Sequence, residues 1–441
     1  MAFINRATAL NVKSELDIFS KLPIQTTVES GALHSYRPVT SISNEGPVEF
    51  VVSGTSNDEY LDLGRVYIYV KVRLTTMVPP AVPGQPAPIP GTVGPVNNWL
   101  HSMFSQVDVY LNQKCITPPS NCYPYRAYIE NLLNYSSESK KTHLSSGVWA
   151  DDTANNMDIA GNANVGFTAR RELTRHNQDV ELYGPLHCDL FNVDKYLING
   201  VEMTIKMNRA NQLFHIMGTA NSVGLFELKD AVLFVRKVKI APGTLLAHHK
   251  VLNTATAKYP INRVDIRTMT IPQNTQSKTL DNIFLGTLPK RCVLGFVSTE
   301  AFNGSLTTNP FNFTSFNYIS VGFYLDSVAV PTKPFNCDFA TNQYIRAYHS
   351  LFEGSNINHS DIGNNISRVD YPNGYALLAV DFTPDLCSSA THVSLPKTGS
   401  LRIDVRFAAP LAQSITAIVF AEFDGLIEID QYRNIVTDYS C

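Results

Sequence analysis

The sequence predicts an all-β protein made of two tandem eight-stranded jelly-roll β-sandwiches, a double jelly roll, with short helices in its loops. Three observations predict this fold. The chain has 441 residues, which is too long for one ordinary core and suits two domains of roughly 200 residues. A composition with 25 Pro, 24 Gly, 20 Tyr and 23 Phe favours strands and turns. Finally, one strand-and-helix signature occurs twice, about half a chain apart.

The signature is an alternating strand followed by a short amphipathic helix. Its first copy has the strand Val107–Asn112 and apolar residues at helical spacing over 125–133. In the second copy Val321–Asp326 repeats the strand, and Arg126-Ala-Tyr recurs as Arg346-Ala-Tyr. This recurrence indicates one duplicated fold. We expect both arginines to form structural or inter-subunit ion pairs.

Further strands recur in order in the two halves. Each half contains two early strands, the signature, one weaker strand and two closing strands. With weaker strands between these, we expect about eight strands per half, which favours a jelly roll over a seven-stranded immunoglobulin sandwich. The first half has Val48–Ser53, Val66–Leu74, a weaker strand near Val180–His187, Val201–Met207 and Leu228–Ile240. The second half has Arg267–Ile271, Val293–Val297, a weaker strand near Tyr375–Phe382, Leu401–Phe407 and Ile415–Ile429.

The chain divides into an N-terminal arm at 1–45, a first jelly roll at 46–245 and a second at 246–441. In the arm, Ser14 can cap a short helix that carries Leu16, Ile18 and Phe19. So many apolar residues favour an arm that docks on another surface, and these three are the predicted assembly contacts. The loops at 79–95 and 136–178 are predicted to be exposed, as recognition surfaces or as tolerated insertions.

Charge and cysteine usage restrict the classes of function. The net charge of -3 argues against a broad nucleic-acid-binding surface. The chain contains no signal-peptide pattern and no apolar run of membrane-spanning length. Seven irregularly spaced cysteines, none in a Cys-x-x-Cys motif, predict that most of them are buried free thiols. We therefore expect maturation in the cytoplasm or nucleus, without secretion.

The best enzymatic candidate is a set of carboxylates near the C-terminus, Glu422, Asp424 and Glu428. Residues two apart on a strand share a face, so two of these could act as the acid and nucleophile of a retaining glycosidase. The spacing from Asp424 to Glu428 is one residue longer than in the Glu-x-Asp-x-x-Glu of some jelly-roll glycanases. Because Gly425 predicts a turn, we favour a turn flanked by solvated acids. A two-domain glycan-processing enzyme is the alternative function.

Other chemical patterns are weak. His248-His249 has no ligand at metal-binding spacing, and the basic pairs Lys140-Lys141 and Arg170-Arg171 are expected to be solvated. His187-Cys188-Asp189 contains the residue types of a triad, but neighbouring strand residues point to opposite faces. A lectin-like module is a further alternative, and it would expose Trp99 or Trp149 in a groove. We expect no catalytic residue, metal site or cofactor.

Several motifs resemble the double jelly-roll major capsid proteins of Polinton (Maverick) elements and adintoviruses, within the lineage of the adenovirus hexon. The resemblance spans nearly the whole chain, and the motifs occur in the same order. They are Ser14–Phe19, Gly46–Phe50, Tyr60–Leu63, Val107–Asn112, Tyr125–Glu130 and Ala421–Asp430.

The resemblance implies a structural role in a virion. Two jelly rolls would stand side by side in each chain, and three chains would form a homotrimer, a pseudo-hexameric capsomer that tiles an icosahedral shell. The implied partners are neighbouring capsomers and a single jelly-roll penton protein. No enzymatic activity, specific nucleic acid or integral membrane association is expected.

Overall fold

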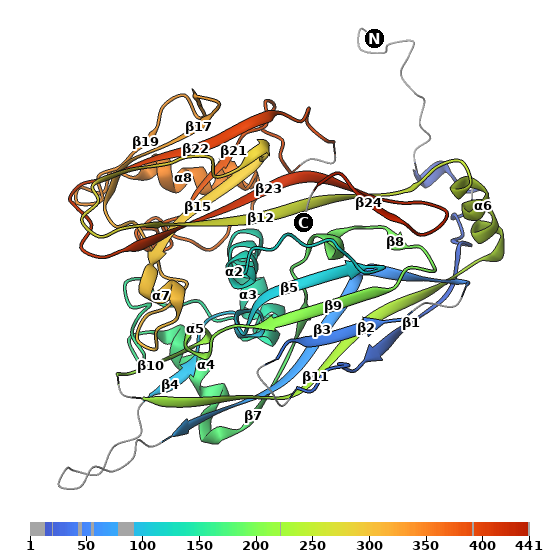
Figure 1. Ribbon diagram of the computed structural model, residues 1–441, viewed down its shortest axis with the longest axis horizontal. Helices are drawn as coiled ribbons and strands as arrows, with labels where there is room; N and C mark the ends of the chain where they lie inside the picture. Colours follow the sequence, from blue (N-terminus) through green and yellow to red (C-terminus); the bar gives the residue numbers. More distant parts are fainter. Residues whose placement is uncertain are drawn as a thin grey trace.

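The computed structural model describes residues 14–19, 21–42, 46–53, 57–77, 92–220, 222–389 and 392–439. The predicted loop at 79–95 therefore lies outside the described residues, except for residues 92–95. In the described chain, two β-sandwiches lie side by side (Figure 1).

The first sandwich has two antiparallel sheets of four main strands each. One has the order β1-β11-β3-β7, and β8 adds to β3. The other has the order β2-β9-β5-β6. The strands are β1 (Val28–Tyr36), β2 (Val48–Val52), β3 (Glu59–Met77), β5 (Phe104–Leu111), β6 (Lys114–Cys115), β7 (Asp179–Pro185), β8 (Tyr196–Leu197), β9 (Met203–Arg209) and β11 (Val223–Ile240).

The second sandwich repeats this topology strand for strand. Its sheets have the orders β12-β23-β15-β21 and β13-β22-β17-β18. Each half thus has eight principal strands in the same arrangement, which confirms the predicted double jelly roll. The strands are β12 (Ala257–Ile271), β13 (Ser277–Leu280), β15 (Arg291–Ser298), β17 (Tyr318–Leu325), β18 (Val328–Ala329), β21 (Leu378–Asp381), β22 (Thr398–Phe407) and β23 (Ile415–Ile429).

Short strands and helices complete the fold. The short strands are β4 (Val93–Pro95), β10 (Ile216–Gly218), β14 (Leu285–Thr287), β16 (Phe313–Thr314), β19 (Phe335–Asn336), β20 (Asn373–Gly374) and β24 (Ile435–Thr437). The helices are η1 (Ser14–Leu16), α1 (Trp99–Ser102), α2 (Tyr123–Asn134), α3 (Ser137–Lys141), η2 (His143–Gly147), α4 (Val165–Leu173), η3 (Arg175–Asn177), η4 (Asp189–Asn192), α5 (Gln212–His215), α6 (Pro242–Leu252), α7 (Thr299–Asn303) and α8 (Ile345–Gly354). The helix predicted over 125–133 is confirmed as α2, and α8 holds the same place in the second topology.

The structure corrects the predicted limits of the arm. Strand β1 lies within the range 1–45, yet it pairs with β11 along its length and is the counterpart of β12. Strand β2 therefore corresponds to β13. The sequence pattern had matched it with Arg267–Ile271, which is the end of β12. The pattern missed β1 because this edge strand is exposed on both faces and lacks apolar alternation. The proposed boundary at 245/246 lies inside α6.

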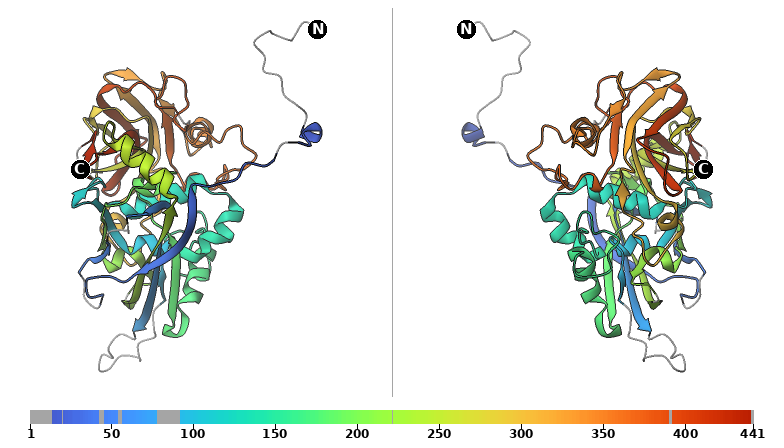
Figure 2. Two further views of the ribbon diagram at one scale, coloured as in Figure 1. Left: turned by 90° about the vertical axis from the view of Figure 1, so that its right-hand side faces the viewer. Right: turned by 90° about the vertical axis from the view of Figure 1, so that its left-hand side faces the viewer.

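The two sandwiches are stacked in the same orientation. The β12-β23-β15-β21 sheet of the second faces the first, and α2 lies between them (Figure 1). The β1-β11-β3-β7 sheet lies on the far side of the first sandwich. Helix α8 and the helical segment after β6 lie on one side of the molecule, whereas η1 lies away from both sandwiches (Figure 2).

The cysteines behave as predicted within the described residues. Cys122, Cys188, Cys292 and Cys337 are buried thiols, and Cys115 and Cys387 are half-buried thiols. Burial raises the pKa of Cys122 to about 12, so this thiol is not a ready nucleophile. In the described part of the chain, helices long and apolar enough to span a membrane are absent.

Gly354 allows α8 to lie directly against β21. An added Cβ would lie 2.6 Å from both the carbonyl carbon and the Cβ of Ala379. We predict that Gly354→Ala lowers the free energy of unfolding by about 1–3 kcal/mol, because two backbones must move apart. Urea denaturation measures this change.

Gly243 provides the matched control, since it lies in α6 with no atom within 4 Å of an added Cβ. Gly243→Ala should leave stability unchanged or raise it by about 0.5–1 kcal/mol. Equal stability of the two variants would contradict the close packing of α8 on β21.

Candidate functional site

The junction between the two jelly rolls is the most elaborate polar and aromatic site in the described chain, and it is built around α2. Ten of the twelve α2 residues are buried. A helix that is apolar on most sides is normally buried on most sides, and here both sandwiches cover it. Pro124 stands in the first turn, where its missing N–H costs no helical hydrogen bond.

Aromatic side chains join α2 to the second jelly roll. The Tyr128 ring stacks on Phe311, with centroids 4.3 Å apart and planes 4° apart. On its other side Tyr128 stacks on Trp149 at 5.2 Å. Tyr125 stacks on Phe302 of α7 at 5.8 Å. Offset stacking of this kind adds to the apolar burial and fixes the relative position of the rings.

A buried charged network lies on the opposite side of α2. Arg126 forms ion pairs with Glu130 at 2.9 Å and with Asp189 at 2.7 Å. The second oxygen of Glu130 lies 2.6 Å from Nδ1 of His187. The Val264 amide of β12 donates a 3.1 Å hydrogen bond to Asp189. The network thus reaches from α2 through η4 to the second jelly roll.

The network sets the ionisation of its members. Burial disfavours the charged form of Glu130, but Arg126 and the hydrogen bond from His187 outweigh it and lower the pKa of Glu130 to about 2. Burial and the nearby His187 hold the pKa of His101 well below its usual value. Glu130 is therefore a carboxylate at neutral pH, bound to cationic and hydrogen-bonding partners.

His187, Cys188 and Asp189 do not lie on a strand, which corrects the argument made from the sequence. Strand β7 ends at Pro185, and Asp189 begins η4. His187 and Asp189 therefore reach the same network, although adjacent strand positions would have kept them apart. The Cys188 thiol is buried, and burial raises its pKa. Its side chain packs in the core of the first jelly roll.

Arg126 forms the predicted structural ion pairs, whereas Arg346 occupies a different environment within the chain. The Arg346 guanidinium donates to the carbonyl oxygens of Pro334 at 2.9 Å and Lys333 at 2.8 Å, and it lies over the Phe335 ring. Among the described residues, carboxylates within ion-pair distance of Arg346 are absent. The matched strand orders, and not these arginines, carry the evidence for duplication.

The segment 136–178 is part of the junction, whereas the sequence predicted an exposed loop. Lys140, expected to be solvated, is buried, and its ammonium donates to the carbonyl oxygens of Leu132 at 2.8 Å and Asn364 at 2.6 Å. Burial lowers the pKa of Lys140 to about 8. Its neighbour Lys141 remains exposed. The segment therefore ties the first jelly roll to the second.

A buried ion pair within this segment is linked by hydrogen bonds to the second jelly roll. Arg170, predicted to be solvated, pairs with Asp152 at 2.6 Å, and both side chains are at most 1% exposed. The other oxygen of Asp152 accepts a 3.0 Å hydrogen bond from Asn309 of the second jelly roll. The Tyr375 hydroxyl donates to the Asp152 carbonyl at 2.7 Å. These partners satisfy a carboxylate that burial would otherwise make costly.

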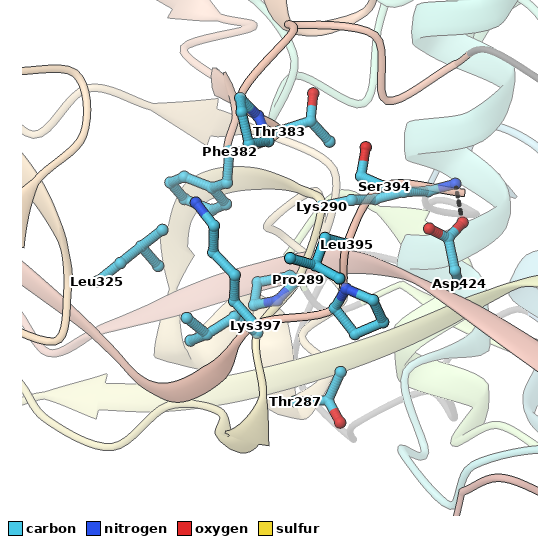
Figure 3. Close-up of a pocket in the computed structure, with 13 residues that line it drawn as sticks. Thr287, Pro289, Lys290, Leu325, Phe382, Thr383, Ser394, Leu395, Lys397 and Asp424 are labelled. Atoms are coloured by element: carbon cyan, nitrogen blue, oxygen red, sulfur yellow. Dashed lines mark hydrogen bonds and ion pairs between the residues drawn. The ribbon is translucent and has the colours of Figure 1, made fainter. Parts of the chain in front are cut away.

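The three C-terminal carboxylates lie on one continuous strand, so the turn predicted at Gly425 is wrong. Strand β23 pairs with β12 throughout, with Gly425 opposite Ile261. Each carboxylate has its own partner. Glu422 pairs with Arg291, Asp424 with Lys290 at 2.9 Å, and Glu428 accepts from Thr256. Figure 3 shows Lys290 and Asp424 beside a cavity of about 60 Å³.

Glu422 and Asp424 line separate cavities, unlike the paired carboxylates of a retaining glycosidase, which share one site. The cavity beside Asp424 is much smaller than ligand pockets, which are typically about 300–1,000 Å³. Glu422 lines a separate junction cavity of about 520 Å³ together with Glu130. A general acid needs a raised pKa, but the pKa of Glu130 is lowered.

The structure also places the tryptophans and the histidine that the sequence analysis considered as candidates. Trp99 and Trp149 are both buried, so neither forms the exposed platform expected of a lectin groove. His248 on α6 stacks on Tyr60, whose hydroxyl lies 3.0 Å from its Nδ1. Groups of three His, Cys, Asp or Glu side chains placed to hold a metal are absent from the described residues.

The predicted assembly contacts are highly exposed. Leu16, Ile18 and Phe19 are 70%, 75% and 90% exposed, and η1 lies away from both jelly rolls. Leu22 and Ile24 continue the exposed apolar series toward β1.

The junction should depend on pH through Glu130. Its pKa is near 4.5 without its partners and about 2 in the folded chain, so its contribution to stability is complete above pH 4.5 and is lost as the pH falls toward 2. We predict that Glu130→Gln lowers the free energy of unfolding by about 3 kcal/mol at pH 7. Denaturation of both proteins from pH 7 to pH 2 should show this difference shrinking below pH 4.5.

Glu138→Gln serves as the control, because the exposed Glu138 carboxylate pairs only with Lys141 on the surface. It should unfold like the wild type at every pH. If the free energies of unfolding of the wild type and Glu130→Gln differed by the same amount down to pH 2, the lowered pKa of Glu130 would be contradicted.

Solved structures share this fold over nearly the whole chain. A chain of the Sputnik virophage structure matches with a TM-score of 0.62 at 11% identity, covering 98% of this chain and 93% of that one. The Faustovirus major capsid protein matches with a TM-score of 0.58 at 9% identity, covering 96% and 93%. A chain of the PBCV-1 virus capsid matches with a TM-score of 0.54 at 10% identity, covering 96% and 100%.

The sequence matches no family model. It is 25% identical over 431 residues to the uncharacterized protein F54H12.2 of Caenorhabditis elegans, covering 94% of this chain and 98% of that protein. The chain thus has the double jelly-roll fold found in viral capsid structures, and its sequence similarity to an animal protein extends over 94% of its length.

Proposed function

We propose that the chain is a major capsid protein, a structural subunit that forms a homotrimer and so a pseudo-hexameric capsomer. One observation carries this proposal. Two jelly rolls of identical strand order are stacked in one chain, and this full-length fold is similar to that of the Faustovirus major capsid protein. The virion is the corresponding location, with assembly in the host cytoplasm or nucleus.

The duplication gives a physical reason for a trimer. Three chains with two similar jelly rolls each supply six similar units, so a three-fold ring can occupy a position with six neighbours in an icosahedral shell. Permanent interfaces of this kind typically bury about 2,000 Å² or more. The shell partners are neighbouring capsomers and a single jelly-roll penton protein at the vertices.

The proposed affiliation is with the capsid proteins of Polinton (Maverick) elements and adintoviruses. The ordered motifs support it, among them Val107–Asn112 and Ala421–Asp430. A structural role, without enzymatic activity, is consistent with carboxylates that are engaged in ion pairs and hydrogen bonds.

The oligomeric state provides the direct test. Purified chain should elute as a species of three times the monomer mass in size-exclusion chromatography with light scattering. Negative-stain images should show hexagonal blocks, and larger shells should form at high concentration. A stable monomer at all concentrations would contradict the proposal.

The exposed residues Leu16, Ile18 and Phe19 are the proposed contacts between capsomers. Deletion of residues 1–25 ends before β1 and should therefore leave trimers intact. Shell formation should fall sharply, because the exposed apolar side chains lose the burial that assembly gives them. Negative-stain counts of shells and light scattering of trimers measure the two effects separately.

A triple change, Leu16→Asp with Ile18→Asp and Phe19→Asp, should reproduce the deletion. The matched control is Leu285→Asp, which changes an exposed apolar residue on β14. Shells of normal yield from the truncated chain would show that the arm has no role in assembly.

A further inference from the structure

A cavity of about 520 Å³ lies beside α6, the helix that links the two jelly rolls. Its walls come from the start of β1, from β3 and β8, from the end of β11, from α6 and from the start of β12. Helix α6 lies at the right-hand end of the molecule in Figure 1. The volume is within the range of ligand pockets, about 300–1,000 Å³, which often form where domains meet. We call this cavity the linker pocket.

The pocket exists because α6 contributes little buried surface. Of its eleven residues only Leu252 is buried. The helix nevertheless carries Leu245, which is half-buried, and Leu246 and Val251, which are exposed. A helix of a globular protein normally packs its apolar residues against a core. Val251 instead lines the pocket, so this part of α6 faces a cavity where packed side chains would be expected.

Two tyrosines line the pocket with hydroxyl groups that already have partners in the chain. The Tyr60 hydroxyl lies 3.0 Å from Nδ1 of His248, and the two rings are stacked. The Tyr259 hydroxyl accepts a 3.1 Å hydrogen bond from the Ile198 amide and donates a 3.1 Å hydrogen bond to the carbonyl oxygen of Tyr196. These polar atoms are thus satisfied, and the rings add apolar surface to the walls.

The charged side chains that line the pocket are both lysines. Lys195 and Lys258 are exposed, and the Lys195 ammonium donates to the Lys258 carbonyl at 3.4 Å, which places it at the start of β12. Among the described residues that line the pocket, Asp and Glu are absent. The apolar part of the lining is formed by Val28, Ile198, Ile240, Val251, Leu252 and Ala257. An apolar wall with two ammonium groups suits an anionic amphiphile.

Carboxylates in the neighbourhood of the pocket have other partners. Glu428 stands opposite Lys258 in the sheet, but it does not line the pocket and it accepts a hydrogen bond from the Thr256 hydroxyl. Glu29 and Asp58 lie 3.6 and 3.7 Å from the ammonium of Lys239. The two lysines of the pocket therefore give it a positive charge that its own lining does not neutralise.

We propose that the linker pocket binds a fatty carboxylate, an unbranched acyl chain with one anionic head group. The acyl chain lies against the apolar side chains of α6, β11 and β12, and its burial supplies most of the affinity. The carboxylate lies beside Lys195 and Lys258, which orient the ligand. This inference goes beyond the proposed capsid role and does not depend on it, because one chain forms the whole pocket.

Calorimetric titration of the full chain with octanoate, dodecanoate and hexadecanoate, each below its micelle-forming concentration, measures the binding. One ligand should bind per chain. Affinity should rise about fourfold for each further methylene that the pocket buries. Dodecanol, which has the same chain length as dodecanoate and no charge, should bind more weakly than dodecanoate. Circular dichroism in the presence of each ligand verifies that the chain stays folded.

A pair of variants on α6 tests the position of the acyl chain. Val251→Asp places a charge in the apolar wall and should lower the affinity for hexadecanoate about tenfold or more. Leu246→Asp is the matched control, because Leu246 is an exposed apolar residue of the same helix that does not line the pocket. It should bind hexadecanoate like the wild type.

Reversal of the two lysine charges tests the position of the head group. Lys195→Glu with Lys258→Glu should lower the affinity for dodecanoate about tenfold and leave that for dodecanol unchanged. The control is Lys278→Glu with Lys333→Glu, which reverses two exposed lysines outside the pocket.

Four outcomes would overturn the proposal. The first is a wild-type chain that binds none of the three carboxylates. The second is equal weakening by the two lysine pairs or by the two α6 variants, which would indicate non-specific association. The third is binding that occurs only after deletion of residues 1–25, which would make the arm the occupant. The fourth is binding to phosphatidylserine vesicles without binding of free fatty carboxylates, which would indicate a membrane contact.

Discussion

The ion pairs of Arg126 are the constraint on which the relative placement of the two jelly rolls depends. Apolar burial supplies most of the driving force for packing α2 between the sandwiches, but it is not directional. Arg126 fixes the orientation of α2 between the sandwiches, because its buried guanidinium must lie within ion-pair distance of Glu130 and Asp189. Asp189 in turn accepts the Val264 amide of β12, so the position of one buried charge aligns a strand of the second jelly roll.

The sequence allowed accurate prediction where one face of a strand is buried and the other is not. Strands β3, β9 and β22 show this alternation, and each was located from it. Strand β1 escaped prediction because both of its faces are exposed in the single chain. The alternation of a strand thus reflects how each of its faces is buried, and a strand exposed on both faces lacks that signal.

The junction was harder to predict because its buried residues are polar. The segment 136–178 has the Asn, Asp, Ala and Gly content of an exposed loop, yet Lys140 and Arg170 are buried in it. Their charges are satisfied by Asp152 and by carbonyl oxygens from segments far away in the sequence. Such pairing depends on three-dimensional contacts between remote positions, which composition and periodicity do not contain.

The two helices of the repeated signature show how one motif acquires two environments. Arg126 is buried because α2 has a jelly roll on either side, whereas Arg346 meets only nearby carbonyl oxygens because α8 has one. The difference in burial follows from the stacking, since α2 lies between the two jelly rolls and α8 does not (Figure 1). Burial at equivalent positions of the two halves therefore depends on their place relative to the junction, which the repeated motif does not encode.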